Sequence, residues 1–533
     1  MASPFFRRKS PDQLIREASA PERQLIRALG AFDLTCIGIG AIIGAGIFAL
    51  AGTAAAGEQF EASVWKTPIL NFIQSALAHS PVVFGRPGAG PAVMLSFVVA
   101  ATACAFAALC YAELASMIPV SGSAYTYSYA TLGEIIAWII GWDLILEYAV
   151  GNMAVAVGWA GYFVQLCANA GLKFPLWLVS DHATAAQKIR QGGEALANYS
   201  SATLPTVGGY DITINLPALV IVAAITVLLV YGIRESARTN SVIVITKVAV
   251  VVFVIAFGSS MVNPGNWHPF LPNGMGGMMS GAAIVFFAFI GFDAVSTTAE
   301  ETRRPQRDMP IGIIASLVIC TLLYVLMAAV ITGMRKYTAY FGDSAAVATA
   351  FAGRPWAQSV ISAGALAGLT SVLLVFQLGQ PRIFMAMARD GLLWPYFARI
   401  HPRFRTPHVT TIWTGIFVGV VAMLTDIGSL SDLTNIGTLF AFILVCFGVI
   451  ILRRKDANRP RPFRVPFVPW FPLLGVGFCL LLMLSLPLET WIRFVVWLVI
   501  GLTIYFLYGA WHSKLRQGLD VGETENVYPP VEP

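Results

Sequence analysis

Long apolar segments alternate with short polar ones along the whole of the 533-residue chain. A helix needs about 20 mostly apolar residues to cross a membrane. By this rule we predict twelve membrane-spanning helices, at residues 31–51, 91–117, 132–163, 215–232, 239–259, 280–299, 310–333, 357–387, 409–424, 430–452, 467–487 and 491–511. The ninth helix is short, and a very short turn at Pro487 separates the last two.

The distribution of charge predicts the orientation of these helices. Residues 1–30 are polar and basic and lack the cleavage pattern of a signal peptide, so we expect a retained cytoplasmic segment. With that segment inside, 23 of the 34 Lys and Arg residues fall in inside segments and 9 in outside segments. Because cytoplasmic loops carry the excess of positive charge, both termini are predicted to be cytoplasmic, including a tail at 512–533. The basic runs 303–304 and 453–455 are interpreted as orientation signals.

Composition agrees with a multi-pass protein of the cell (inner) membrane embedded in the lipid bilayer. Hydrophobic residues make up 57% of the chain and charged residues only 12%, whereas soluble domains carry about 25% charged residues. This balance excludes an ordinary soluble enzyme, a disordered chain and a nucleic-acid-binding protein. All seven Cys lie in or beside apolar segments without a metal-binding spacing, so we expect no metal and no cofactor.

Two of the predicted helices contain sequence that is unfavourable for a continuous helix. Four glycines fall between Gly38 and Gly46, and each costs about 1 kcal/mol relative to Ala in a helix. Gly291 lies in the middle of the sixth helix, two residues before Asp293. The glycines could allow close helix packing. Alternatively, the helices are unwound there, and the exposed ends hold the carboxylate and ammonium groups of a zwitterion.

Interrupted helices at corresponding places in two halves of a transporter point to an inverted repeat with a binding site near the middle of the membrane. Several motifs, taken in order, resemble the amino acid–polyamine–organocation (APC) superfamily of transporters, and within it the bacterial relatives of cationic amino acid transporters. The motifs are GIGAIIGAGIF at 38–48, YAEL at 111–114, PVSGSAY at 119–125, GWDLILEY at 141–148, FIGFD at 289–293, PQRDMP at 305–310, GQPR at 379–382 and ARDGLL at 388–393.

The resemblance implies an all-α integral membrane fold with a five-plus-five inverted repeat (LeuT-like) and discontinuous helices one and six. The first repeat would cover residues 31–259 and the second 280–452, and residues 467–511 would add two further helices.

The resemblance also implies where the substrate binds, between the unwound parts of helices one and six. Its carboxylate would meet backbone N–H groups, its ammonium would meet backbone carbonyls, and Phe287 would cover it as an aromatic gate. Related proteins often have Ser or Thr at the position of Ala45, so the carboxylate would here depend on the backbone alone. The residues expected at this site are Ile42, Gly44, Ala45, Gly46, Phe287, Ala288, Ile290 and Gly291.

Further side chains are candidates for the site because of their depth in the membrane. Lys247 has long apolar runs on both sides, and an ionisable group at such a depth suggests a function. It resembles the lysine of sodium-independent, proton-coupled members of the superfamily, with a fixed structural cation as the alternative. Glu147 is predicted to sense the substrate ammonium, share a proton with the site or make a structural hydrogen bond. Phe376 and Gln377 are expected on the wall that faces the substrate side chain.

These features favour a proton-coupled amino acid symporter that works by alternating access, with amino acid and proton as its partners. A bulky Phe376 favours a small or medium neutral amino acid, with a cationic one also possible. Amino acid exchange without net proton movement is the alternative within transport, and a membrane sensor or scaffold is the alternative from another class. An enzyme is disfavoured, because the sequence has no phosphate-binding loop, metal-ligand cluster or nucleophile motif. The sequence leaves any partner subunit open.

Overall fold

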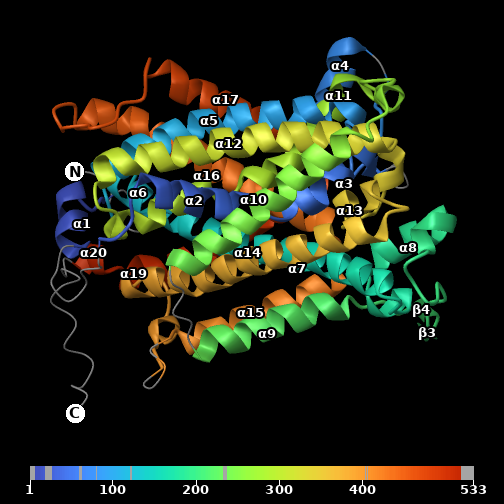
Figure 1. The fold of residues 1–533 in the computed structure, drawn as a ribbon. Helices are drawn as coiled ribbons and strands as arrows, with labels where there is room; N and C mark the ends of the chain where they lie inside the picture. Colours follow the sequence, from blue (N-terminus) through green and yellow to red (C-terminus); the bar gives the residue numbers. More distant parts are fainter. Residues whose placement is uncertain are drawn as a thin grey trace.

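The computed structural model is a bundle of long helices that run side by side (Figure 1). It describes residues 7–18, 27–58, 63–79, 81–120, 123–231, 237–401, 404 and 406–517, so most of the predicted C-terminal tail lies outside the described residues. The long elements are α2 (Ala31–Ile42), α5 (Val93–Met117), α7 (Glu134–Asn169), α9 (Leu216–Tyr231), α10 (Ala237–Ser259), α11 (Gly274–Val285), α12 (Pro305–Met334), α14 (Pro355–Arg389), α15 (His408–Leu424), α16 (Ile427–Lys455), α17 (Trp470–Leu484) and α18 (Leu488–Ile504).

Shorter elements continue or connect these helices. The first span continues after α2 as η3 (Gly46–Leu50) and α3 (Ala51–Ala56), and the sixth continues after α11 as η8 (Phe286–Phe289) and η9 (Phe292–Glu301). The remaining helices are α1 (Pro11–Ala18), α4 (Ile69–Ala78), η4 (Gly90–Ala92), α6 (Ser123–Thr131), η5 (Leu176–Leu178), α8 (His182–Gln191), η6 (Gly193–Leu196), η7 (Pro264–Trp267), η10 (Tyr337–Tyr340), α13 (Ala346–Ala350), η11 (Pro395–Ala398), η12 (Tyr505–Gly509), α19 (Ala510–His512) and α20 (Lys514–Gln517).

Two short antiparallel strand pairs are the strand structure of the described residues. One pairs β1 (Gly57–Glu58) with β2 (Arg86–Pro87), and the other pairs β3 (Thr206–Val207) with β4 (Tyr210–Asp211). Figure 1 places α4, α8 and β3–β4 at one end of the bundle and α1, α19 and α20 at the other.

Each of the twelve predicted ranges contains helix. Within the described residues, seven helices are long and apolar enough to cross a membrane, or eight if α2 and the bent continuation through α3 count as one span. Four more apolar helices, α4, α9, α15 and α17, are shorter. The chain is therefore a mainly helical, multi-pass membrane protein, while the twelve-span count and the inverted repeat remain predictions.

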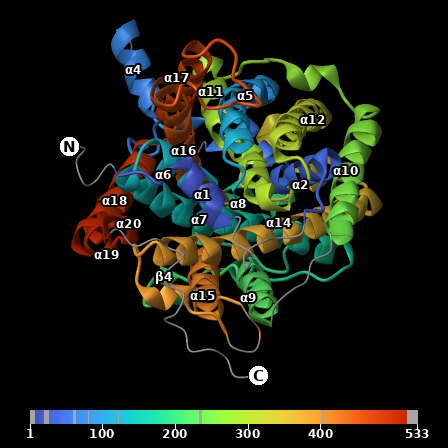
Figure 2. The same ribbon diagram turned by 90° about the vertical axis from the view of Figure 1, so that its left-hand side faces the viewer.

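The helices pack around α7, which is buried over most of its length and lies against α14 and α16 (Figure 2). The pair α9 and α15 and the helix α10 lie at the perimeter (Figure 2). Perimeter helices expose large apolar side chains, including Val220, Val227, Val242, Ile245, Val318, Leu322, Trp413, Phe417, Val495 and Val499. Such a surface suits contact with lipid tails.

Ion pairs connect segments that are far apart in the sequence. Arg453, which the charge pattern marked as an orientation signal, also donates bidentately to Glu113 at 2.9 and 2.6 Å. The backbone N–H of Val465 donates to the same carboxylate at 2.7 Å. Lys9 donates to Asp390 at 3.0 Å and therefore attaches the N-terminal segment to the end of α14. The motif at 388–393 thus has a structural role at this end of the bundle.

A buried ion pair joins strand β2 to α16. The guanidinium of Arg86 donates to both carboxyl oxygens of Asp432 at 2.5 and 2.7 Å, and neither residue is more than 3% exposed.

We expect Arg86→Met to destabilise the protein by about 3–5 kcal/mol, because it leaves the carboxylate of Asp432 buried without its partner. The measurement is thermal unfolding of the purified protein in detergent. The double variant Arg86→Met/Asp432→Leu should recover most of the loss, and equal destabilisation by the single and double variants would contradict this explanation.

Candidate functional site

The first span is broken where its glycines cluster. Helix α2 ends at Ile42, and Ile43 has an extended backbone with φ −73° and ψ 99°. The chain then resumes as η3 and α3, bent by 41° from α2. The end of α2 presents carbonyls without partners in the helix, and the start of η3 at Ala45 and Gly46 presents N–H groups in the same way. The structure thus contains the break that the glycine pattern allowed.

The sixth span is broken at Gly291. Regular α-helix ends at Val285, η8 follows, and Ile290 is extended with φ −60° and ψ 132°. Gly291 has φ 117°, a region that favours glycine, and η9 begins immediately after it. The carboxyl group of Asp293 lies within hydrogen-bonding reach of the backbone N–H groups of Gly291 and Ala294 and so supports this turn.

The two breaks contact each other directly. A Cβ atom built on Gly46 would lie 2.2 Å from the Cα of Ala288. A Cβ atom on Gly291 would lie 2.9 Å from the carbonyl of Ala41. Both spans therefore pass each other at backbone distance, which only glycine permits at these two positions. The unwound segments and the close packing, which the sequence offered as alternatives, occur together.

The carbonyls that have no partner within α2 at its end accept hydrogen bonds from side chains of two other helices. Lys247 of α10 is fully buried, and its Nζ donates to the carbonyl of Gly40 at 2.7 Å. Its aliphatic stem passes Gly368 of α14, where an added Cβ would lie 3.2 Å from the lysine Cγ. The hydroxyl of Tyr324 from α12 donates to Ile42 O at 2.7 Å and reaches Ala288 O at 3.1 Å.

Tyr324 is a site residue that the sequence analysis missed. The available signal was a lone phenol in the middle of the apolar stretch 310–333. A tyrosine in such a stretch usually finds a hydrogen-bond partner when buried. The sequence does not show that this partner is the break in helix one, which lies 282 residues away.

A small cavity lies beside the breaks. Its lining residues are Ala41, Glu147, Tyr148, Ile290, Gly291, Asp293, Ala294, Val372, Val375 and Phe376. Four predicted site residues, Glu147, Ile290, Gly291 and Phe376, are therefore brought together here. The ring of Phe376 packs edge-on against Tyr148 with centroids 5.5 Å apart. Two carboxyl groups in a mostly apolar cavity give it a preference for groups that donate hydrogen bonds.

Gln377 does not line this cavity. Its amide donates to the hydroxyl of Thr226 on α9, on the other face of α14. One residue along a helix turns the side chain by about 100°, so Phe376 and Gln377 cannot both face the same cavity. The other predicted residues surround the first break: Gly44 contacts Val372, and Ala45 lies against Gly158 of α7. Phe287 is buried within η8 and is not among the lining residues of the cavity.

The buried acids on α7 lie in different surroundings. Glu147 is within hydrogen-bonding reach of Thr438 on α16 and lines the cavity. Asp143, one turn earlier, is fully buried and packs against Gly437. Neither of its carboxyl oxygens has a hydrogen-bond partner in the described part of the chain. A carboxyl in this position is favoured in its neutral form, because an unpaired charge is costly to bury.

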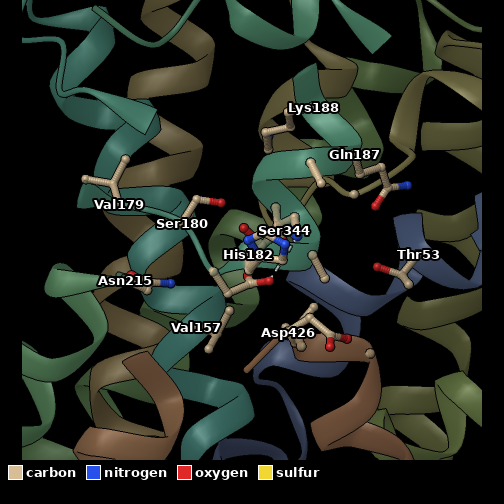
Figure 3. A pocket seen from close by; sticks show the side chains of 18 of the residues that line it. Thr53, Val157, Val179, Ser180, His182, Gln187, Lys188, Asn215, Ser344 and Asp426 are labelled. Carbon is tan, nitrogen blue, oxygen red and sulfur yellow. Dashed lines mark hydrogen bonds between the residues drawn. The ribbon is translucent and has the colours of Figure 1, made fainter. Parts of the chain in front are cut away.

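A larger vestibule opens at the end of the bundle that contains α8 (Figure 3). Its volume is about 250 Å³, and Thr53, Val157, His182, Ser344 and Asp426 are among its lining residues. Val157 precedes Gly158, whose position packs against Ala45 and Ala49 of the broken span. The lining of the vestibule therefore includes the residue next to one that packs against the first break.

Two carboxylates from different elements line the vestibule. Asp181 caps α8 by accepting from Thr184 N at 2.9 Å, and Asp426 caps α16 by accepting from Ser429 N at 2.8 Å. Burial raises the pKa of the Asp181 carboxyl above its ordinary value, and the negative charge of Asp426 raises it further. Lys66, Lys188 and Arg190 also line the vestibule, which therefore carries charges of both signs.

Comparisons with known proteins agree with this architecture. The sequence pattern of the amino acid permease family matches residues 29–507. The chain is 46% identical to the branched-chain amino acid permease BcaP of Bacillus subtilis (strain 168), over 97% of this chain and all of that protein. It is 42% identical to the methylthioribose transporter of the same organism, over 97% and 100% of the two chains.

A plant protein is also similar to this chain. The chain is 36% identical to the vacuolar cationic amino acid transporter 4 of Arabidopsis thaliana, over 84% of this chain and 67% of that protein. The resemblance to the APC superfamily that the motifs indicated is thus confirmed. With its two broken spans in contact and a family match over most of its length, the chain belongs to the amino acid permease family.

Proposed function

We propose that this permease takes up an L-amino acid by proton symport and alternating access. The observation that carries the proposal is the meeting of two broken spans, where the carbonyls of Ile42 and Ala288 lie close enough to bond one hydroxyl oxygen. Carbonyls at the ends of helices attract cations, and N–H groups at helix starts attract anions. A zwitterion fits such a site with its ammonium at these carbonyls and its carboxylate at Ala45 and Gly46.

Alternating access would open, one at a time, the two sets of contacts that close this site toward the two ends of the bundle. Gly158 and Ile427 separate the breaks from the vestibule, because Gly158 packs against both Ala45 and Ile427. At the opposite end, the N–H of Leu29 donates to Glu301 O at 3.0 Å and joins the start of α2 to the end of η9. Opening of one closure at a time would expose the site to one side of the membrane.

Lys247 is proposed as the proton carrier. In its charged form the ammonium binds the carbonyl of Gly40 and neutralises the partial negative charge at the end of α2. Loss of the proton weakens this hydrogen bond and allows α2, the half of the first span before the break, to move. Coupling follows if substrate release favours the state in which the lysine loses its proton. Amino acid exchange remains the alternative, in which Lys247 is a fixed cation.

The proposed substrate is a small or medium neutral amino acid. Phe376 and Tyr148 narrow the cavity next to the breaks. The name of the branched-chain permease at 46% identity supports such a substrate. The name of the methylthioribose transporter at 42% identity supports a second candidate, a neutral sugar thioether without ammonium or carboxylate. The name of the plant relative supports a third candidate, a cationic amino acid.

A competition experiment distinguishes these substrates. The purified protein is reconstituted in proteoliposomes, and uptake of labelled leucine is measured with leucine, 4-methylpentanoate, 3-methylbutylamine, lysine or methylthioribose in excess. We expect leucine to compete and lysine and methylthioribose not to compete. We expect neither analogue to compete, because each lacks one charged group. Competition by methylthioribose alone, or by the analogues as well as by leucine, would contradict a zwitterion site at the breaks.

Substitution of Phe376 should change the selectivity of the site. We expect Phe376→Ala to raise the uptake of methionine or lysine relative to alanine by about tenfold, the scale of selectivity that one side-chain group provides in an apolar pocket. Gln377→Ala is the matched control, because that side chain turns toward α9 and should leave the ratio unchanged. A larger effect at Gln377 than at Phe376 would show that a different face of α14 meets the substrate.

The orientation is proposed from the charge pattern. Both termini lie on the cytoplasmic side of a bacterial inner membrane, and the vestibule beside α8 opens to the outside. Impermeant thiol labelling of single cysteines introduced at Ala197 and at Arg454 in intact cells tests this, and we expect labelling only at Ala197.

A further inference from the structure

Tyr324 is held in a fixed position between the two broken spans. It lies in the middle of α12 and is fully buried. Its ring packs against Phe97, with centroids 5.5 Å apart, and against Phe289, with centroids 5.4 Å apart. Because the ring is packed on two sides, the position of the hydroxyl is restricted.

The hydroxyl binds at the point where the two breaks meet. It donates to Ile42 O, the last residue of α2, and it also lies 3.1 Å from Ala288 O in η8. Both carbonyl oxygens are therefore within about 6 Å of each other, and both lie at interruptions where the helix leaves carbonyls unpaired. A hydroxyl has one proton to donate, whereas an ammonium has three.

A substrate ammonium placed between these two carbonyl oxygens would occupy the position of the Tyr324 oxygen. The two donors exclude each other at this point, because each would fill the space between the same two oxygens. We propose that the Tyr324 hydroxyl replaces the substrate ammonium at Ile42 O and Ala288 O whenever the carrier changes conformation without substrate. This inference rests on the proposed function and adds a positioning residue to it.

The consequence concerns the return step of the transport cycle. Buried carbonyls without a donor are costly, so a carrier that closed around an unoccupied site would be disfavoured. Tyr324 supplies the donor for Ile42 and Ala288, while Lys247 supplies it for Gly40. The carrier can then return without substrate and carry out net uptake. Exchange of one substrate for another does not need this return, because an ammonium is present in both directions.

The test compares net uptake with exchange for Tyr324→Phe in proteoliposomes. The variant keeps the ring and its contacts with Phe97 and Phe289 but loses the hydroxyl. We expect net leucine uptake to fall about tenfold, the scale expected when buried carbonyls lose their donor. We expect leucine counterflow at saturating substrate to remain within about twofold of the unsubstituted protein, and the KM to fall, because the ammonium no longer competes with a hydroxyl.

Tyr340→Phe is the matched control. Tyr340 is also fully buried, and its hydroxyl donates to a backbone carbonyl, that of Ile331, at 2.7 Å. Its loss should not separate net uptake from counterflow. Thermal unfolding and size-exclusion chromatography confirm that both variants are folded before transport is compared.

Two outcomes would overturn the proposal. An equal loss of net uptake and counterflow in Tyr324→Phe would make the tyrosine a structural residue, and a raised KM would place the hydroxyl in the substrate-bound site. Failure of the unsubstituted protein to transport any amino acid is a separate result, which would reject the proposed function and not the role of the hydroxyl alone.

Discussion

Lys247→Ala is expected to abolish concentrative uptake of amino acid, with a reduction of at least about 100-fold, while counterflow continues. Lys247 lies on α10 and is fully buried, and its ammonium donates to Gly40 O near the end of α2. A buried lysine that exchanges its proton can link the pH gradient to the state of the broken span. The measurement is leucine uptake into proteoliposomes with an alkaline interior, together with leucine counterflow without a gradient.

A second substitution separates proton exchange from fixed charge. Arginine keeps its proton at all accessible pH values. We therefore expect Lys247→Arg to lose gradient-driven uptake as the alanine variant does. Retained concentrative uptake by the arginine variant would identify Lys247 as a fixed cation. Lys173→Ala is the control, because this exposed lysine binds a loop carbonyl at Ala197 and should leave transport unchanged.

Gly46→Ala should remove transport by separating the two broken spans. The added methyl group would lie 2.2 Å from the Cα of Ala288, a backbone atom that cannot move without shifting η8. Overpacking of this kind costs about 1–3 kcal/mol or more, and the carbonyl pair of Ile42 and Ala288 would lose its spacing. We expect uptake and counterflow to fall at least about 100-fold and thermal stability to decrease.

Gly477→Ala provides the control for this glycine. An added Cβ at Gly477 of α17 meets nothing within 4 Å, so both stability and transport should be unchanged. Gly44→Ala is an intermediate case, because its methyl group would lie 3.2 Å from a side-chain atom of Val372 that can give way. Normal transport by Gly46→Ala would show that the close approach of the two spans is not needed.

The positions of the long helices and of both breaks could be predicted from the sequence because their signals are local. Apolar runs of sufficient length mark the spans, and the glycines between Gly38 and Gly46 and at Gly291 mark the places where a helix is weak. The structure has α2 ending at Ile42 and η9 beginning after Gly291, as these glycines suggested. Lys247 was identifiable for a similar reason, because a charge within an apolar run is rare.

The partners of these groups could not be predicted, because they depend on how distant helices pack. Tyr324 is one of several tyrosines in apolar segments, and nothing local connects it to Ile42. Arg86 and Asp432 are separated by 346 residues. Gln377 faces α9 and not the cavity because helix phase determines which side chain of a neighbouring pair meets the site, and an uncertainty of one residue in phase exchanges Phe376 for Gln377.

In the proposed mechanism, a zwitterion bound where the two broken spans meet is carried together with a proton. Uptake of labelled leucine into sodium-free proteoliposomes with an alkaline interior tests it most directly. We predict accumulation above the external concentration, loss of that accumulation when a protonophore is added, and no effect of sodium. Uptake that only equilibrates, or that requires sodium, would contradict the proton-coupled mechanism.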